Sequence, residues 1–122
     1  MDYKEFLEQI QYRAKLDSSV DAVCAARPTL QCLAERLSGS EAGYLVAQLP
    51  MEIAVYLLQK GSGSGQRFSL DEFFERVSEL EREDLAVSIH HARVVLEVLQ
   101  EAVSNVRAHV RGEFDRLFDA GS

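Results

Sequence analysis

Two blocks of this sequence occur twice at nearly constant spacing. Residues 2–10 (DYKEFLEQI) return as residues 69–77 (SLDEFFERV), and residues 26–38 (ARPTLQCLAERLS) return as residues 92–104 (ARVVLEVLQEAVS). Phe6 and Phe73 are 67 residues apart, while Leu30 and Leu96 are 66 apart. The spacing predicts a duplicated helical unit, in which most apolar residues serve packing between helices.

Apolar residues recur at helical spacing along most of the chain, and no segment shows the sustained alternation of a strand. The predicted fold class is therefore all-α: a compact helical domain of two similar but unequal halves, with about seven helices. We expect these helices over about residues 2–15, 19–38, 42–49, 50–58, 70–80 and 84–104, with a last one containing Phe114, Leu117 and Phe118.

Helix caps and prolines refine these boundaries. Asp2 is a plausible N-cap, Ser40 can cap the short third helix, and Ser69 with Glu72 forms a capping box. Pro28 lies inside the second expected helix, so that helix either kinks or breaks. The second copy has Val94 at this position, where a helix runs on, and we therefore favour the kink.

A chain of 122 residues fits one domain, residues 1–122. We expect two halves, residues 1–60 and 68–120, joined by a Gly/Ser linker at 61–67 whose GSGSG composition is typical of flexible segments. The second half lacks most of the short third helix. The core of the second half is then either thinner or completed by the apolar fourth helix or by a second subunit. We predict a homodimer.

Four segments resemble the bacterial family known as domain of unknown function 2267. They are residues 2–7 (DYKEFL), 33–39 (LAERLSG), 47–50 (AQLP) and the repeated FSLDEF at 68–73. Each motif is short, but their order and spacing are specific, and the resemblance covers essentially the whole chain. It implies a compact helical domain of two similar halves in a bacterial cytoplasm, and it implies no activity.

The charge balance bears on the partners. Thirteen Lys and Arg against twenty Asp and Glu give a net charge of −7, which disfavours nucleic acid and anionic membranes. The N-terminus has no apolar signal-peptide region, and no apolar run approaches the ~20 residues of a membrane helix. Cys24 and Cys32 would lie about 12 Å apart on one helix, too far for a disulfide. We expect a cytoplasmic protein with reduced thiols.

No catalytic, cofactor-binding or metal-ligating constellation is recognisable. His90 and His91 have no His, Cys or carboxylate three or four residues away, as a helical metal site requires. We expect His90 in solvent and His91 hydrogen-bonded within a mostly apolar stripe. The chain has neither a nucleophile elbow nor a phosphate-binding glycine motif. These absences favour a protein that is not an enzyme, without cofactors.

Candidate residues outside the packing pattern are few. Arg27 and Arg93 occupy matching positions in the two copies, as do Glu5 and Glu72. One hypothesis is that each Arg, on a long helix, forms an ion pair with the Glu on the helix before it. The other is that all four charges are solvated. The fourth helix is nearly all apolar, so it is buried or meets a partner, and its candidate interface residues are Ile53, Tyr56 and Leu57.

The leading hypothesis is a non-catalytic module that binds another, unknown protein or associates with itself. The alternative is a domain that binds a small apolar ligand in a pocket between the two halves. The residues expected to line that pocket are Phe6, Phe73, Phe74, Leu96 and Val98.

Overall fold

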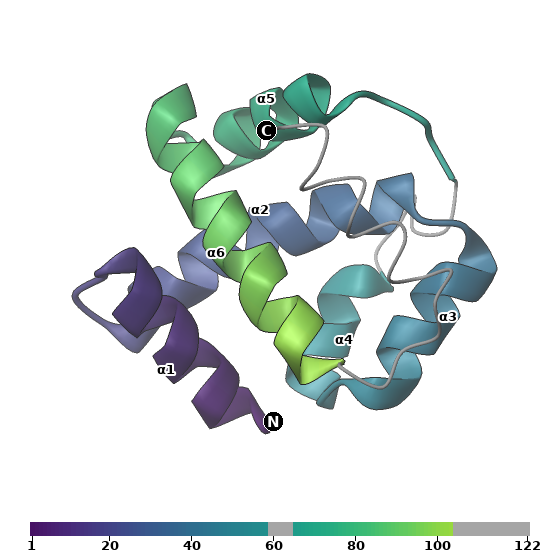
Figure 1. The fold of residues 1–122 in the computed structure, drawn as a ribbon, viewed down its shortest axis with the longest axis horizontal. Helices are drawn as coiled ribbons and strands as arrows, with labels where there is room; N and C mark the ends of the chain where they lie inside the picture. The colour runs from purple at the N-terminus through teal and green to yellow at the C-terminus, as the bar shows by residue number, and fades with distance from the viewer. Residues whose placement is uncertain (59–64, 104–122) are drawn as a thin grey trace.

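Two helix pairs of matching length form the framework of the protein. The computed structural model describes residues 1–58 and 65–103, which contain α1 (Tyr3–Ala14), α2 (Ser19–Arg36), α3 (Gly39–Gln48), α4 (Met51–Leu57), α5 (Leu70–Glu81) and α6 (Leu85–Ala102) (Figure 1). α1 and α5 have 12 residues each, and α2 and α6 have 18 each. The all-α prediction is confirmed. The expected last helix, around residues 114–118, lies outside the described residues.

The first helix of each pair begins and ends in the same way. The side chains of Asp2 and Ser69 accept the backbone N–H three residues later, at 2.8 and 3.1 Å. Each satisfies one of the donors that have no partner inside the helix. At the other end, Lys15 and Arg82 adopt left-handed backbone conformations, with φ of 57° and 61°. A residue of this conformation stops a helix and turns the chain toward the next one.

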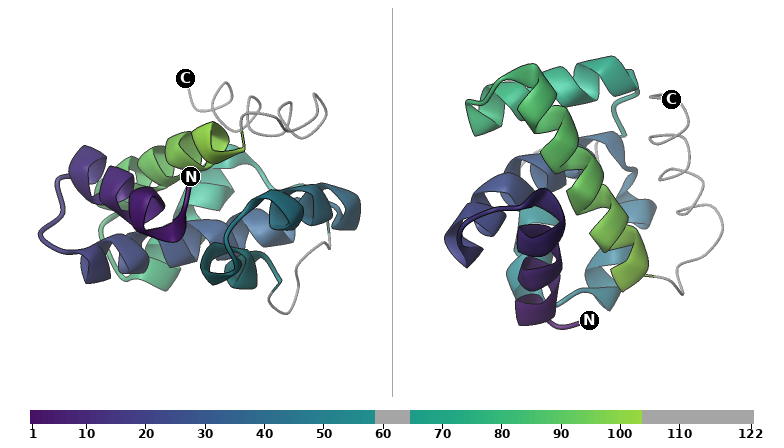
Figure 2. Two further views of the ribbon diagram at one scale, coloured as in Figure 1. Left: turned by 90° about the horizontal axis from the view of Figure 1, so that it is seen from below. Right: turned by 60° about the vertical axis from the view of Figure 1, so that its left-hand side comes forward.

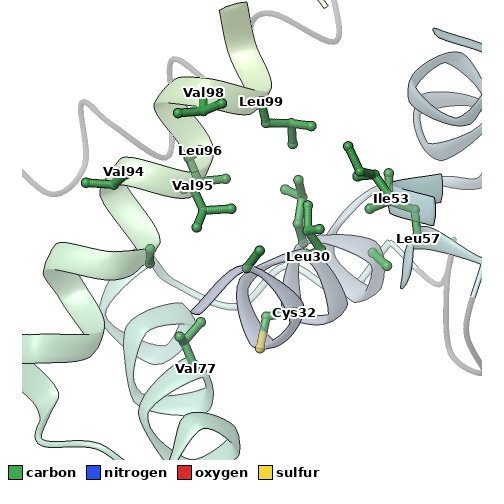
Figure 3. Packing of buried hydrophobic residues seen from close by; sticks show 14 of the residues in the cluster. Leu30, Cys32, Ile53, Leu57, Val77, Val94, Val95, Leu96, Val98 and Leu99 are labelled. Atoms are coloured by element: carbon green, nitrogen blue, oxygen red, sulfur yellow. The ribbon is translucent and has the colours of Figure 1, made fainter. Parts of the chain in front are cut away.

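α2 occupies the middle of the fold and runs through Pro28 without a break. It packs against α1, α4, α5 and α6. The other long helix, α6, packs against α1, α2 and α5 (Figures 1 and 2). Figure 3 shows Leu30 of α2, Ile53 of α4 and Val95 and Leu99 of α6 pointing into one interior. All four are at most 1 % exposed. Packing on α2 thus explains the apolar residues on one side of α4.

α3 begins earlier than the sequence analysis predicts. Its N-cap is Ser38 rather than Ser40. The Ser38 hydroxyl accepts the backbone N–H of Glu41 at 3.3 Å, and the Glu41 carboxylate accepts the N–H of Ser38 at 2.9 Å. This reciprocal pair satisfies two donors at once, which a cap at Ser40 would not do.

The chain that leads into α5 is bound to the end of α2. The N–H groups of Gly65 and Gln66 donate to the carbonyls of Leu37 and Glu35, at 3.1 and 3.0 Å. They give partners to carbonyls that the end of a helix leaves free. Gly65 has a φ of +65°, a conformation that favours glycine. Of the predicted linker, Gly65 and Gln66 are therefore tied to the domain, and residues 61–64 lie outside the described ranges.

Thr29 gives a first testable prediction. Its side chain is fully buried, and its hydroxyl has no hydrogen-bond partner within the described residues. The matching residue of the second copy is Val95, which is equally buried. Thr29→Val removes an unsatisfied polar group at nearly constant shape, so we expect the free energy of unfolding to rise by about 1 kcal/mol.

Urea denaturation followed by circular dichroism measures this change. Thr29→Ser is the matched control, because it keeps the hydroxyl and removes the methyl group, and we expect it to be destabilising. A loss of stability in Thr29→Val would show that the hydroxyl has a favourable partner in solution.

Candidate functional site

The end of the molecule formed by α3 and α4 is almost free of charge. Between Ala42 and Leu58 the only charged residue is Glu52, although 27 % of the whole chain is charged. The two helices are joined by Leu49 and Pro50 and pack on each other, and they lie together at one end of the fold (Figure 2). Depletion of charge is the compositional mark of the centre of a protein–protein interface.

α4 has two apolar sides, of which one is buried. Ile53 and Leu57 are 1 % and 0 % exposed and lie in the core. Tyr56, the third predicted interface residue, is half-buried near Tyr3, and burial raises the pKa of the Tyr3 phenol. The structure therefore places two of the three candidate interface residues inside the domain and leaves only Tyr56 partly accessible.

The accessible side of α4 carries a different set of apolar residues. Met51, Val55 and Leu58 are 67 %, 42 % and 59 % exposed. Met51 and Val55, four residues apart, lie on one face of the helix, and Leu58 is its C-cap residue, three positions further on. We call these three residues the α4 ridge. The sequence pattern did not identify it, because α4 is apolar on nearly every side and only packing shows which side stays exposed.

α3 has a shallow depression on its outer surface. It has a volume of about 320 Å³ and is lined by Ser40, Gly43, Tyr44 and Ala47. Ser40, Gly43 and Ala47 are small residues three and four positions apart, so they follow one side of the helix. A Cβ atom added at Gly43 would meet no atom of the described residues within 4 Å. We call this depression the α3 groove.

A buried polar cluster joins the end of α5 to α6. The Glu81 carboxylate accepts a hydrogen bond from the Ser88 hydroxyl at 2.9 Å, and its other oxygen lies 2.5 Å from Nδ1 of His91. The Glu81 and His91 side chains are only 6 % and 12 % exposed, and Ser88 is fully buried. The sequence pattern predicts a hydrogen-bonded His91 but not its partner, which is ten residues away.

The order of these groups argues against nucleophilic catalysis. A catalytic serine must give its proton to a base, usually a histidine that a carboxylate orients. Here Glu81 lies between the other two groups, so the Ser88 hydroxyl donates to the carboxylate and not to His91. The cluster therefore acts as a clamp between two helices.

The predicted ion pairs are replaced by others. Glu72 accepts from Arg76 at 2.6 Å, one turn along α5, and Arg76 also approaches Glu35 of α2 at 3.5 Å. The guanidinium of Arg93 lies 5.7 Å from the centre of the Phe74 ring, and Arg27 is exposed. Within the described residues no ion pair joins Glu72 to Arg93, or Glu5 to Arg27. Glu72 prefers Arg76 because residues four apart on a helix face each other.

Arg13 connects α1 to α6. It donates to Glu97 at 2.6 Å and to both oxygens of Glu101 at 2.7 and 2.8 Å. The hydrogen bonds from Arg13 hold the pKa of the Glu101 carboxyl below its usual value. A carboxyl whose pKa is lower in the folded state stabilises the fold above its unfolded pKa, and this contribution disappears as the pH falls through the folded pKa.

Glu101→Gln tests this contact. We expect it to lower the free energy of unfolding by about 0.5 kcal/mol at pH 7, a small effect because the pair is largely in solvent. The difference from the unmodified protein should shrink toward zero below about pH 4. Urea denaturation at a series of pH values measures it. A difference that is constant with pH would exclude the ion pair as its cause.

The remaining candidate residues are the two cysteines and the possible metal ligands. Cys24 is exposed and Cys32 buried, both are free thiols, and burial raises the pKa of Cys32 to about 12. A thiol of such high pKa is a poor nucleophile. In residues 1–58 and 65–103 no three His, Cys, Asp or Glu side chains are grouped to hold a metal ion. Among the described helices, none has the length and apolarity to cross a membrane.

Taken together, these features define an all-helical domain with a charge-depleted end and a buried polar clamp between α5 and α6. The chain belongs to the family of uncharacterized conserved proteins DUF2267, whose model matches residues 3–117. This confirms the family to which the sequence motifs point. Neither the curated proteins nor the solved structures contain a match to the chain.

Proposed function

We propose that this protein is a non-catalytic cytoplasmic module that associates with a second copy of itself through the end formed by α3 and α4. The observation behind the proposal is the α4 ridge, which exposes three large apolar side chains on a short helix and its C-cap. Burial of such surface is the main driving force of protein association, at about 25 cal/mol per Å².

The net charge supports this location. Two copies that each carry a charge of −7 repel each other, so a contact between them is favoured where the surface is least charged. The α3–α4 end meets that condition, because the two helices carry only two charged residues, Glu52 and the buried Glu41. The same acidity disfavours nucleic acid and anionic membranes as partners.

Sedimentation velocity over a wide range of protein concentration tests the proposal. We expect a monomer–dimer equilibrium that shifts toward the monomer in Val55→Lys, because a charge in the ridge must be desolvated in the contact. Leu80→Lys is the matched control, since Leu80 is 53 % exposed on α5, away from α3 and α4. A protein that stays monomeric at every concentration would contradict self-association.

The alternative of a small apolar ligand has less support. Phe6, Phe73, Phe74, Leu96 and Val98 belong to one core cluster and are at most 5 % exposed. They pack against protein in the described fold, so a ligand between the halves would have to displace them.

A further inference from the structure

We infer that the buried cluster of Glu81, Ser88 and His91 is a proton-controlled latch between α5 and α6. The latch is closed while the Glu81 carboxylate is ionised and is released when acid protonates it. The inference does not depend on the proposed self-association, because the latch and the α4 ridge belong to different helices.

The matching positions of the first copy are filled by three small apolar residues. Counted back by 67 residues on α5 and by 66 on α6, the polar cluster falls on Ala14 at the end of α1 and on Ala22 and Ala25 of α2. These alanines are 7 %, 0 % and 1 % exposed, so the joint between α1 and α2 is packed there without a polar side chain. Replacing a buried ion pair by apolar residues is often neutral or stabilising. The packing of the repeat therefore does not explain the polar cluster of the second copy.

Glu81 is the only acidic group of the cluster, and both of its oxygens are engaged. One accepts from the Ser88 hydroxyl at 2.9 Å, and the other lies 2.5 Å from Nδ1 of His91. Within residues 1–58 and 65–103, neither α1 nor α2 gives Glu81 or His91 a hydrogen bond or an ion pair. On α6 itself, the centre of the His90 ring lies 6.0 Å from that of His91. The turn between the helices adds three charged residues that are exposed, Arg82, Glu83 and Asp84.

The protonation state of Glu81 decides whether these hydrogen bonds can form. An ionised carboxylate accepts from both neighbours, and His91 can donate from Nδ1 in its neutral or its charged form. A charged His91 strengthens the contact as long as Glu81 stays ionised. When acid protonates both side chains, the carboxyl group itself becomes a donor, and the imidazolium is buried without an anion beside it. The latch therefore contributes at neutral pH, and its contribution is lost as the pH falls.

Hydrogen exchange at the end of α5 tests the latch in the full chain. We expect the protection factors of the amides of residues 77–81 to fall at least about tenfold along a pH series from about 7 to about 3. They are expressed relative to the amides of Leu30 and Leu33 in the core of α2, so that global unfolding by acid cancels. The triple variant Glu81→Ala, Ser88→Ala and His91→Ala gives this joint the alanines of the first copy, and its relative protection should change by less than about threefold.

Glu81→Gln is the second test, because glutamine keeps the shape of the side chain and does not ionise. Its relative protection should already be reduced at neutral pH and should not fall further in acid. Glu79→Gln, at an exposed position of the same helix, is the matched control and should keep the full response to acid. An equal response in the unmodified protein and the triple variant overturns the inference, and so does a full response in Glu81→Gln. If the triple variant does not fold, the comparison of Glu81→Gln with Glu79→Gln decides alone.

Discussion

Replacing Phe73 with alanine is expected to lower the free energy of unfolding by about 3–5 kcal/mol. Phe73 is fully buried at the centre of an aromatic cluster. Its ring stacks with Phe68 at 6.3 Å between centroids and meets Phe74 edge-on at 5.9 Å. Alanine would leave a cavity that α2, α5 and α6 cannot fill without moving together.

Urea or thermal denaturation, followed by far-ultraviolet circular dichroism, measures this loss. Leu80→Ala is the matched control on the same helix, because Leu80 is exposed and its truncation should change stability by less than about 0.5 kcal/mol. A loss below about 1 kcal/mol in Phe73→Ala would contradict the packing described for α5.

Glu81→Ala is expected to cost about 3 kcal/mol, which is large for a charged residue. The substitution removes the only described partner of the buried Ser88 hydroxyl and of His91 Nδ1. Both groups would remain buried with an unmade hydrogen bond, and such a group costs more than the bond itself contributes. The end of α5 would also lose its clamp to α6.

Glu79→Ala is the matched control two residues earlier, where the side chain is exposed, and we expect a change below about 0.5 kcal/mol. Glu81→Gln should fall between the two, because an amide oxygen can still accept one of the hydrogen bonds. Equal stability of the Glu79→Ala and Glu81→Ala proteins would show that the cluster contributes nothing to the fold.

The stabilising residues and the proposed contact lie on different parts of the molecule. Phe73 and Glu81 hold α5 and α6 together, whereas the α4 ridge and the α3 groove belong to the two short helices at one end (Figure 2). Substitutions in the α4 ridge should therefore change association without changing the core. This separation is what makes self-association testable in a protein whose fold remains intact.

Much of the fold follows from local sequence. Helix periodicity identified all six described helices, and the predicted N-caps at Asp2 and Ser69 are present. The full capping box expected at Ser69 is not formed, because the Glu72 carboxylate accepts from Arg76 instead. These features depend on residues a few positions apart, so a sequence pattern contains them. The Ser38 cap is also local, since Glu41 follows it by three residues, but the serine at position 40 obscured it.

The contacts between helices were harder to predict. The buried partner of His91 is Glu81, which no helical spacing relates to it, and Glu72 pairs with Arg76 rather than Arg93. The accessible side of α4 could not be chosen from sequence, because its apolar residues surround the helix axis. Each of these choices depends on which surfaces meet when α2 packs against its neighbours.

The sequence by itself determined the helical class, the positions of the helices and the family, because periodicity, capping and short motifs are local properties of the chain. Only the tertiary structure decided that Ile53 and Leu57 are core while Met51, Val55 and Leu58 are surface. It also decided that Gly43 borders an open groove. The physical reason is that burial depends on the neighbours a residue meets in space, and long-range packing selects those neighbours.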